Sequence, residues 1–286
     1  MGPHKEHAAP VLVHRGQYYH CHERLTPEYR LGAYEPAIAA LDCKRDAVAM
    51  IHGIGERWDV WETLLWRLNL PGLRSFSIDM PWSGDRGYHW GLKTGAAHWV
   101  GPGLEAVPQE VSVIVAHSLG ANAVLEHLCA HGVGSLRAVI LISPFYRACQ
   151  EELDWEMANY YFRNFRSFLE EGILVRPGMK QRDPDMVSAM AEKVHHRIGP
   201  VGWLQFLTLL CRTPGLNFRH LAVPFFIIGG ARDTACFPAD CAALAQALPQ
   251  GEMTLLPDCG HFSVIERPNT VLQLVQDFLQ RTLNQK

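Results

Sequence analysis

Residues 111–125 read V-S-V-I-V-A-H-S-L-G-A-N-A-V-L, and this stretch decides the fold. The apolar run from Val111 to Val115 is rich in β-branched residues, which is typical of a buried strand. It ends at Ala116-His117-Ser118-Leu119-Gly120, and small, helix-compatible residues follow at once. A strand that turns sharply into a helix, with Ser at the turn, is the nucleophile-elbow pattern. This pattern predicts that the turn raises the Ser118 hydroxyl above the edge of a sheet.

The residues around Ser118 fit such a strained turn, which needs small side chains two positions before and after the Ser. These are Ala116 and Gly120, so the first position departs slightly from G-x-S-x-G. The Leu119 N–H would open the new helix and point at a developing negative charge. Five residues alone leave an alternative open, namely an ordinary turn that happens to contain Ser.

Length and composition limit the classes of protein to consider. The 286 residues suit one large α/β domain or two small ones. A net charge of −3 without a basic run argues against a nucleic-acid partner. No apolar stretch reaches about 18 residues, so we expect no membrane span, and the polar N-terminus predicts no signal peptide. The eight cysteines are scattered without a C-x-x-C pair, which favours reduced thiols in a cytoplasmic protein.

Strand and helix patterns alternate along most of the chain, separated by short loops, which predicts βαβ units and a parallel sheet. The expected strands are 47–52, 73–78, 111–115, 138–142, 224–228 and 252–256. The expected helices are 59–68 with Asp59 as a possible cap, 121–130, 238–248 and 269–283 with Asn269 as a possible cap.

Other segments are less regular. Residues 11–24 alternate loosely around Gly16 and are typical of an edge hairpin, whereas 31–43 are too weakly patterned to assign. Residues 92–107 are expected to be only partly helical, because Gly101-Pro102-Gly103 would break a helix.

From 144 to 218 the strand pattern stops, which predicts a helical insertion dividing a core of residues 1–143 and 219–286. Its aromatic and Met side chains recur at roughly helical spacing. They are Trp155, Tyr160, Tyr161, Phe165, Phe168, Met186, Met190, Trp203 and Phe206. They could form the core of the insertion, line a substrate site beneath it, or do both.

Three side chains could together carry nucleophilic catalysis. A Ser hydroxyl needs a base, usually a His that a buried carboxylate holds in the right tautomer. Ser118 follows one strand, Asp233 follows a later one, and His261 follows the last. Because parallel strands end at one edge of a sheet, residues distant in sequence converge there. The order Ser, Asp, His is that of the α/β-hydrolases.

The chain resembles the α/β-hydrolase superfamily, in its serine-nucleophile branch, over residues 45–284. The resemblance is carried by His52-Gly53, the elbow at 116–120, Gly230-Ala231-Arg232-Asp233 and Gly260-His261-Phe262. It implies an α/β-hydrolase fold, with a mostly parallel central sheet flanked by helices. The insertion falls where the family carries its helical cap, after strand 6.

The resemblance also implies roles for individual residues. Ser118 would be the nucleophile, His261 the general base and acid, and Asp233 the residue that orients the histidine. The oxyanion hole would use the backbone N–H groups of Leu119 and Ile54. Asp258, three residues before His261, is the alternative acid.

Several further residues are candidates for binding substrate, with burial in the protein core as the alternative for each. They are His117, Trp58, Trp82, Trp155, Phe165 and Trp203. His52 is interpreted as holding its loop. No glycine-rich phosphate loop or metal-ligand spacing occurs in the sequence, so no cofactor or metal is expected.

These observations predict a serine hydrolase acting on a small apolar acyl ester, lactone or thioester through an acyl-enzyme. The same triad would also serve a C–C bond hydrolase or an acyltransferase or cyclase, and the fold alone does not separate them. A non-catalytic ligand receptor or scaffold is the alternative outside enzymes. Because position 118 is Ser, dehalogenases and epoxide hydrolases with an Asp nucleophile are disfavoured. The sequence leaves the oligomeric state open.

Overall fold

The computed structural model describes residues 10–37 and 46–284. Its strands are β1 (Val11–His14), β2 (Gln17–Leu25), β3 (Arg30–Pro36), β4 (Asp46–Ile51), β5 (Leu73–Asp79), β6 (Glu110–His117), β7 (Ala138–Ile142), β8 (Phe225–Gly230) and β9 (Gly251–Leu256). Its α-helices are α1 (Glu62–Arg67), α2 (Val100–Leu104), α3 (Leu119–His131), α4 (Trp155–Leu174), α5 (Pro184–Arg212), α6 (Pro238–Ala247), α7 (Ser263–Glu266) and α8 (Pro268–Leu283).

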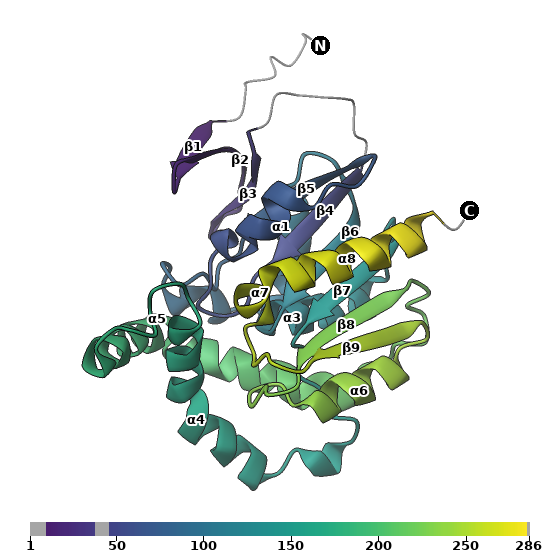
Figure 1. Ribbon diagram of the computed structural model, residues 1–286. Helices are drawn as coiled ribbons and strands as arrows, with labels where there is room; N and C mark the ends of the chain where they lie inside the picture. Colours follow the sequence, from purple (N-terminus) through teal and green to yellow (C-terminus); the bar gives the residue numbers. More distant parts are fainter. Residues whose placement is uncertain (1–9, 38–45, 285–286) are drawn as a thin grey trace.

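All nine strands form one sheet in the order β1-β2-β3-β5-β4-β6-β7-β8-β9. The strands from β4 to β9 are parallel, whereas β1, β2 and β3 form an antiparallel meander at one edge. Helices cover both faces of the sheet (Figure 1). This arrangement confirms the predicted fold class, a mostly parallel sheet flanked by helices. All the carboxyl ends of the parallel strands therefore lie at one edge.

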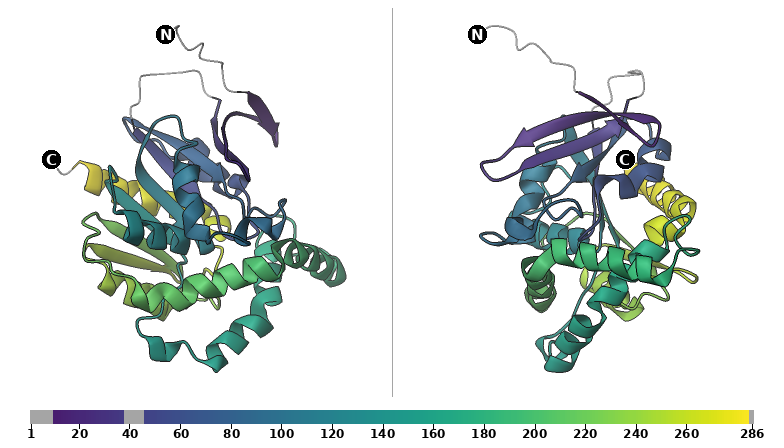
Figure 2. Two further views of the ribbon diagram at one scale, coloured as in Figure 1. Left: turned by 180° about the vertical axis from the view of Figure 1, so that it is seen from behind. Right: turned by 90° about the vertical axis from the view of Figure 1, so that its left-hand side faces the viewer.

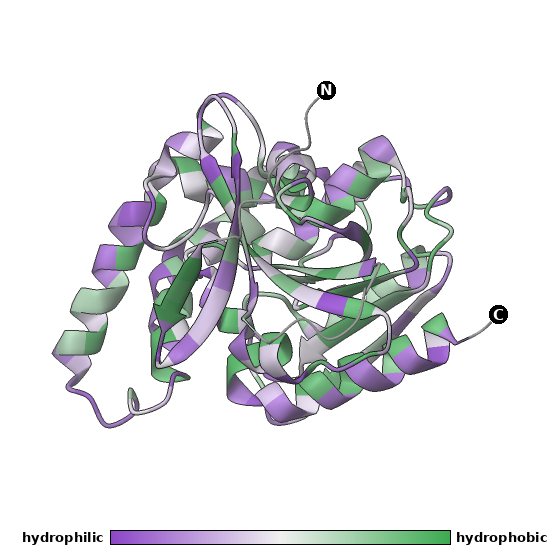
Figure 3. Ribbon diagram, turned by 90° about the horizontal axis from the view of Figure 1, so that it is seen from above, coloured by the Kyte–Doolittle hydropathy of each residue, from purple (hydrophilic) through white to green (hydrophobic). Residues whose placement is uncertain are grey.

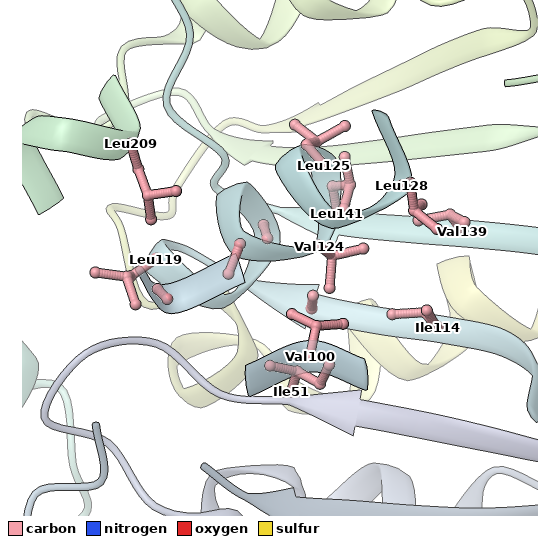
Figure 4. Close-up of a cluster of buried hydrophobic side chains, with 14 of the residues drawn as sticks. Ile51, Val100, Ile114, Leu119, Val124, Leu125, Leu128, Val139, Leu141 and Leu209 are labelled. Atoms are coloured by element: carbon pink, nitrogen blue, oxygen red, sulfur yellow. The ribbon is translucent and has the colours of Figure 1, made fainter. Parts of the chain in front are cut away.

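The two faces of the sheet carry separate cores, because alternate side chains of each central strand point to opposite sides. On one face, Ile114 and Leu141 pack with Val124 of α3, and Leu209 of α5 belongs to the same cluster (Figure 4). On the other face, Val113 packs with Phe278 of α8. Hydrophobic and hydrophilic residues alternate along α8 because only one side of it meets the sheet (Figure 3).

The segment between β7 and β8 holds the long helices α4 and α5, as the loss of strand pattern predicts. Asp154 caps α4 by accepting a hydrogen bond from the Met157 N–H at 2.8 Å. Within α5 the chain bends at Gly199, whose φ of 59° is not helical, and Pro200 follows it. Figure 2 shows the two halves of α5 running in different directions. The bent helix α5 contacts both α3 and the 3₁₀ turn Tyr88–Gly91.

Three local expectations need correction. The chain before α1 is a 3₁₀ turn (Trp58–Trp61), and Asp59 pairs with His14 at 3.1 Å instead of capping a helix. The helix α8 begins at Pro268, and the Asn269 side chain accepts a hydrogen bond from Arg67. Gly101-Pro102-Gly103 lie inside α2, because Pro in a first helical turn needs no acceptor for an N–H.

The strand β3 occupies part of the stretch 31–43, which the sequence pattern left unassigned. It is sandwiched between β2 and β5 and is buried on both faces, so it lacks the alternation of a half-exposed strand. Residues 38–45 lie outside the described part of the chain. Because β3 adds a strand, the insertion follows the seventh strand in chain order, where the sequence pattern counts six.

Candidate active site

Ser118 lies between β6 and α3 in a strained backbone conformation, with φ of 51° and ψ of −124°. Its N–H donates to the Ile142 carbonyl at 2.9 Å, which ties the turn to the neighbouring strand. A Cβ atom at Gly120 would lie 2.5 Å from the His52 carbonyl oxygen, so the turn requires glycine there. Strain of this kind costs about 1–3 kcal/mol and is characteristic of functional sites.

Ser118, His261 and Asp233 are joined by two hydrogen bonds. The Ser118 Oγ lies 2.9 Å from His261 Nε2, and His261 Nδ1 lies 2.9 Å from Asp233 Oδ2. A carboxylate only accepts, so Nδ1 carries the proton and Nε2 is free to accept the Ser118 hydroxyl proton. All three residues are buried, with Ser118 8% exposed. The structure therefore brings together the three side chains that the sequence order singles out.

The charges around His261 stabilise its protonated form. Burial acts to lower the His261 pKa, but Asp233, through its charge and its hydrogen bond, raises it, and Glu56 and Glu171 add to this, so the net shift is upward. For Asp233, burial acts to raise the pKa, and the charge and hydrogen bond of His261 lower it below its ordinary value. The carboxylate also accepts the N–H groups of Ala235 and Cys236, each at 2.8 Å.

Asp258, the alternative acid, is directed to solvent. Its side chain is 61% exposed and pairs with Arg232 at 2.9 Å. Asp233, by contrast, is 3% exposed and holds the His261 ring. Of the two candidates, only Asp233 is in contact with the histidine in this structure.

Two backbone N–H groups near Ser118 are free to bind a negative charge. Leu119 begins α3, where the first N–H groups have no helical acceptor. On the other loop, the N–H of Gly53 donates to Glu56 and that of Gly55 donates to the Trp82 carbonyl, which leaves the N–H of Ile54 between them. Within residues 10–37 and 46–284, neither the Ile54 nor the Leu119 N–H donates a hydrogen bond. These are the two groups that the sequence analysis names for an oxyanion hole.

A family model described as the alpha/beta hydrolase family matches residues 48–274, which is most of the chain. The chain belongs to the alpha/beta hydrolase family. The matched region contains all three members of the Ser118–His261–Asp233 cluster.

Two curated relatives match over short segments only. BpoC of Mycobacterium tuberculosis, by name a candidate non-heme bromoperoxidase, is 39% identical over 54 residues, covering 19% of this chain and 21% of BpoC. The monoacylglycerol lipase ABHD6 of Rattus norvegicus is 34% identical over 68 residues, covering 24% of this chain and 20% of ABHD6. The chain thus spans about a fifth of the length of the relatives it matches.

Solved structures share the fold over nearly the whole chain. A membrane phospholipase A described as a bacterial virulence factor superposes with a TM-score of 0.67 at 16% identity, covering 93% of this chain and 87% of that one. At this identity the similarity extends to the fold alone. In the described part of this alpha/beta hydrolase, no helix has both the length and the apolar character to cross a membrane.

His52 holds the loop that carries Ile54. Its Nδ1 donates to the Gly53 carbonyl at 2.8 Å, and its Nε2 accepts the Met80 N–H at 3.0 Å. Burial is the largest influence on its pKa and lowers it, so the ring is neutral. Trp82 donates from its indole to the His52 carbonyl at 2.9 Å and is 2% exposed. Trp82 therefore braces this loop from the core, the alternative that the sequence left open for it.

Two other candidates for substrate binding also lie inside the protein. Trp58 stacks on Tyr34 and meets Tyr19 edge-on, in the core layer of α1 and α8. His117 is fully buried, and its nitrogens lie 2.9 Å from Glu56 Oε2 and 3.0 Å from the His261 carbonyl. This placement favours burial in the core, the alternative that the sequence left open for Trp58 and His117.

The aromatic residues of the inserted segment divide between its core and its surface. Phe165 is 6% exposed and packs near Phe206, whereas Trp155 at the start of α4 is 81% exposed. Trp203 meets Phe162 edge-on, and Phe162 is itself 69% exposed. Phe165 is therefore core, and Trp155 points to solvent.

The helix α4 also contacts both loops that carry His261 and Asp233. The hydroxyls of Tyr160 and Tyr161 donate to the carbonyls of Thr234 and Ala235 at 2.7 and 2.8 Å. A Cβ atom at Gly260 would lie 2.2 Å from Glu171 Oε1, so the carboxylate lies against this glycine. The inserted segment is thus in direct contact with the loops that carry Asp233 and His261.

Sequence reasoning missed two acidic residues of the site, Glu56 and Glu171. Glu56 is 4% exposed between the two loops. Glu171 is partly buried, and burial raises its pKa. In the sequence, nothing distinguishes Glu171 from its neighbour Glu170, because only the three-dimensional contact with Gly260 sets it apart. Glu56 is equally hard to identify from the sequence, where it is only a carboxylate three residues after Gly53.

One group of side chains has the composition of a metal site. The candidate ligand atoms of Asp233, Cys236 and His261 lie within 4.8 Å of one another. Both His261 nitrogens and both Asp233 oxygens, however, are already engaged in hydrogen bonds. Burial raises the pKa of the Cys236 thiol well above its ordinary value, so the thiol stays protonated. The arrangement is suited to proton transfer rather than to holding a cation.

Proposed function

We propose that this alpha/beta hydrolase is a serine hydrolase that cleaves an apolar acyl ester or thioester through an acyl-enzyme. The observation that carries the proposal is the buried chain of contacts from Ser118 Oγ through His261 to Asp233. A strained turn that presents a hydroxyl to an oriented imidazole is the arrangement that nucleophilic catalysis requires.

In the proposed reaction, His261 Nε2 takes the proton of Ser118 as Oγ attacks the acyl carbon. Asp233 stabilises the imidazolium that forms, and the N–H groups of Ile54 and Leu119 bind the negative oxygen of the tetrahedral intermediate. His261 then gives its proton to the leaving group, and the bond to that group breaks. A water molecule, deprotonated by His261, releases the acid and restores Ser118.

The surroundings of the Ile54 loop support an apolar substrate. Side chains of Val194 and Ile198 on α5 would both lie 3.1 Å from a Cβ atom at Gly55. The Ile54 side chain would lie 3.2 Å from a Cβ atom at Gly202 on the same helix. An acyl group next to these residues would contact hydrocarbon rather than charge. The similarity of a short segment to a monoacylglycerol lipase agrees with such a substrate.

The proposal is tested with a fluorophosphonate probe and a panel of p-nitrophenyl esters of increasing acyl length. We expect the probe to label Ser118, and the Ser118→Ala variant to lose activity on the order of 10⁴-fold or more while keeping its thermal stability. Labelling of another serine, or activity in the Ala variant, would contradict the assignment. Transfer of the acyl group to a dilute alcohol acceptor that outruns hydrolysis by water would favour an acyltransferase instead.

A further inference from the structure

A second buried chain of hydrogen bonds crosses the site beside the first. Glu56 Oε2 accepts the Gly53 N–H at 2.6 Å and lies 2.9 Å from His117 Nδ1. His117 Nε2 in turn lies 3.0 Å from the carbonyl oxygen of His261. This chain links the loop of Ile54, the end of β6 and the main chain of His261.

Both partners of His117 are hydrogen-bond acceptors. A carbonyl oxygen only accepts, so Nε2 must donate to His261. On the other side of the ring, Nδ1 faces Glu56 Oε2, a carboxylate oxygen that also accepts the Gly53 N–H. Both ring nitrogens of His117 are therefore placed to donate.

We propose that Glu56 and His117 form a buried ion pair that positions the oxyanion loop against the catalytic histidine. The inference rests on the proposed function for its effect on turnover, though not for the existence of the pair. Gly53 allows the close approach, because a Cβ atom there would lie 2.9 Å from Glu56 Oε2 and 3.0 Å from His117 Nδ1. Because the pair holds the Gly53 N–H in place, it fixes the orientation of the peptide group just before the one that carries the free N–H of Ile54.

The Glu56–His117 pair is enclosed in the protein, away from solvent and from other charged partners in the described part of the chain. His117 is fully buried and Glu56 is 4% exposed. Glu56 Oε1 has no hydrogen-bond partner among the described residues, so His117 is the main compensation for the carboxylate. Removing either partner leaves the other charge buried and unpaired, whereas removing both charges does not. The two positions should therefore be strongly coupled.

The first test reads the charge of His117 directly, without an assay of activity. Spectra are recorded on protein labelled with ¹⁵N-histidine at pH 8, a pH well above the ordinary histidine pKa of about 6.5. We expect two protonated ring nitrogens at His117, with signals that vanish in His117→Gln. If that variant does not fold, the signals are assigned by contact with the Phe262 ring, 5.9 Å from His117 between centroids, in His261→Gln, because the His261 ring lies 5.0 Å from the same phenyl ring. A bare nitrogen on His117 would overturn the proposal.

The second test compares kcat and KM of Glu56→Gln, His117→Gln and the double variant, using an activated ester. Because misplacing catalytic groups by about 1 Å costs on the order of 10²-fold, we expect each single variant to lower kcat by about that factor with little change in KM. The double variant should be no worse than the worse single variant. Additive losses, or an unchanged kcat, would contradict a positioning pair.

The matched control is His196→Gln, which breaks a His–Glu pair of similar length on the surface of α5. His196 lies 3.0 Å from Glu192, and its side chain is 75% exposed. This variant should keep the wild-type kcat. The two proposals can be contradicted separately. If the probe does not label Ser118, the serine-hydrolase function is wrong, but the spectra of His117 still test the ion pair.

Discussion

Gly172 of α4 lies against the ring of Phe262, the residue that follows His261. A Cβ atom at position 172 would be 2.6 Å from the tip of that ring, closer than real Cβ contacts come. The adjacent residue, Glu171, touches Gly260 on the other side of the histidine. The inserted helix therefore contacts both chain neighbours of His261.

Replacing Gly172 by Ala should disturb catalysis more than stability. The methyl group must push Phe262 aside, which moves His261 relative to Ser118, and about 1 Å of misplacement costs on the order of 10²-fold in rate. Overpacking costs about 1–3 kcal/mol, which the better helix propensity of Ala offsets in part. Kinetics and a thermal melt measure the two effects. Gly215→Ala, where nothing lies within 4 Å of the new Cβ, is the control and should match the wild type.

Glu171→Gln should move the acid limb of the pH profile of kcat/KM to lower pH. His261 acts as a base only when neutral, so that limb follows its pKa. Burial acts to lower this pKa, and Asp233, Glu56 and Glu171 raise it. Removing the Glu171 charge destabilises the imidazolium, so the pKa falls and activity persists to lower pH. Glu170→Gln, one residue away and bonded to Ser188 and Arg166, should leave the limb in place.

The two candidate acids can be ranked by substitution. Asp233→Asn should cost on the order of 10⁴-fold in kcat, because the amide favours the wrong tautomer of His261. Asp258→Asn removes only an exposed pair with Arg232 and should cost almost nothing. Steady-state kinetics of both variants provide the measurement, and the reverse ranking would reassign the acid to Asp258.

Two aromatic residues of α4 should respond in opposite ways to truncation. Phe165→Ala should destabilise the protein by about 3–5 kcal/mol, because the ring is buried near Phe206. Trp155→Ala should stay within about 0.5 kcal/mol, because its side chain is 81% exposed. Denaturant unfolding of both variants measures the difference. Equal effects would contradict the placement of Phe165 in the core of the insertion.

The sequence predicted the parallel sheet and the convergence of Ser118, Asp233 and His261 because those features depend on local patterns. An apolar strand followed by the turn residues 116–120 can be recognised in the sequence. In a parallel sheet, the strands that precede the three residues all end at the same edge, which brings the residues together. The interior strand β3 was left unassigned because its residues are buried on both faces. Glu56 and Glu171 were missed because a carboxylate gains its role from partners far away in sequence. The pairing of His117 with Glu56 was missed for the same reason.

Helix α4 has a further consequence for protein engineering. Tyr160 and Tyr161 hold the loop after Asp233, and Glu171 and Gly172 hold the loop around His261. Exchanging this segment for that of a homologue, a common way to transplant selectivity, would cut both attachments at once. A chimera that keeps these four residues should retain turnover where a plain graft loses it.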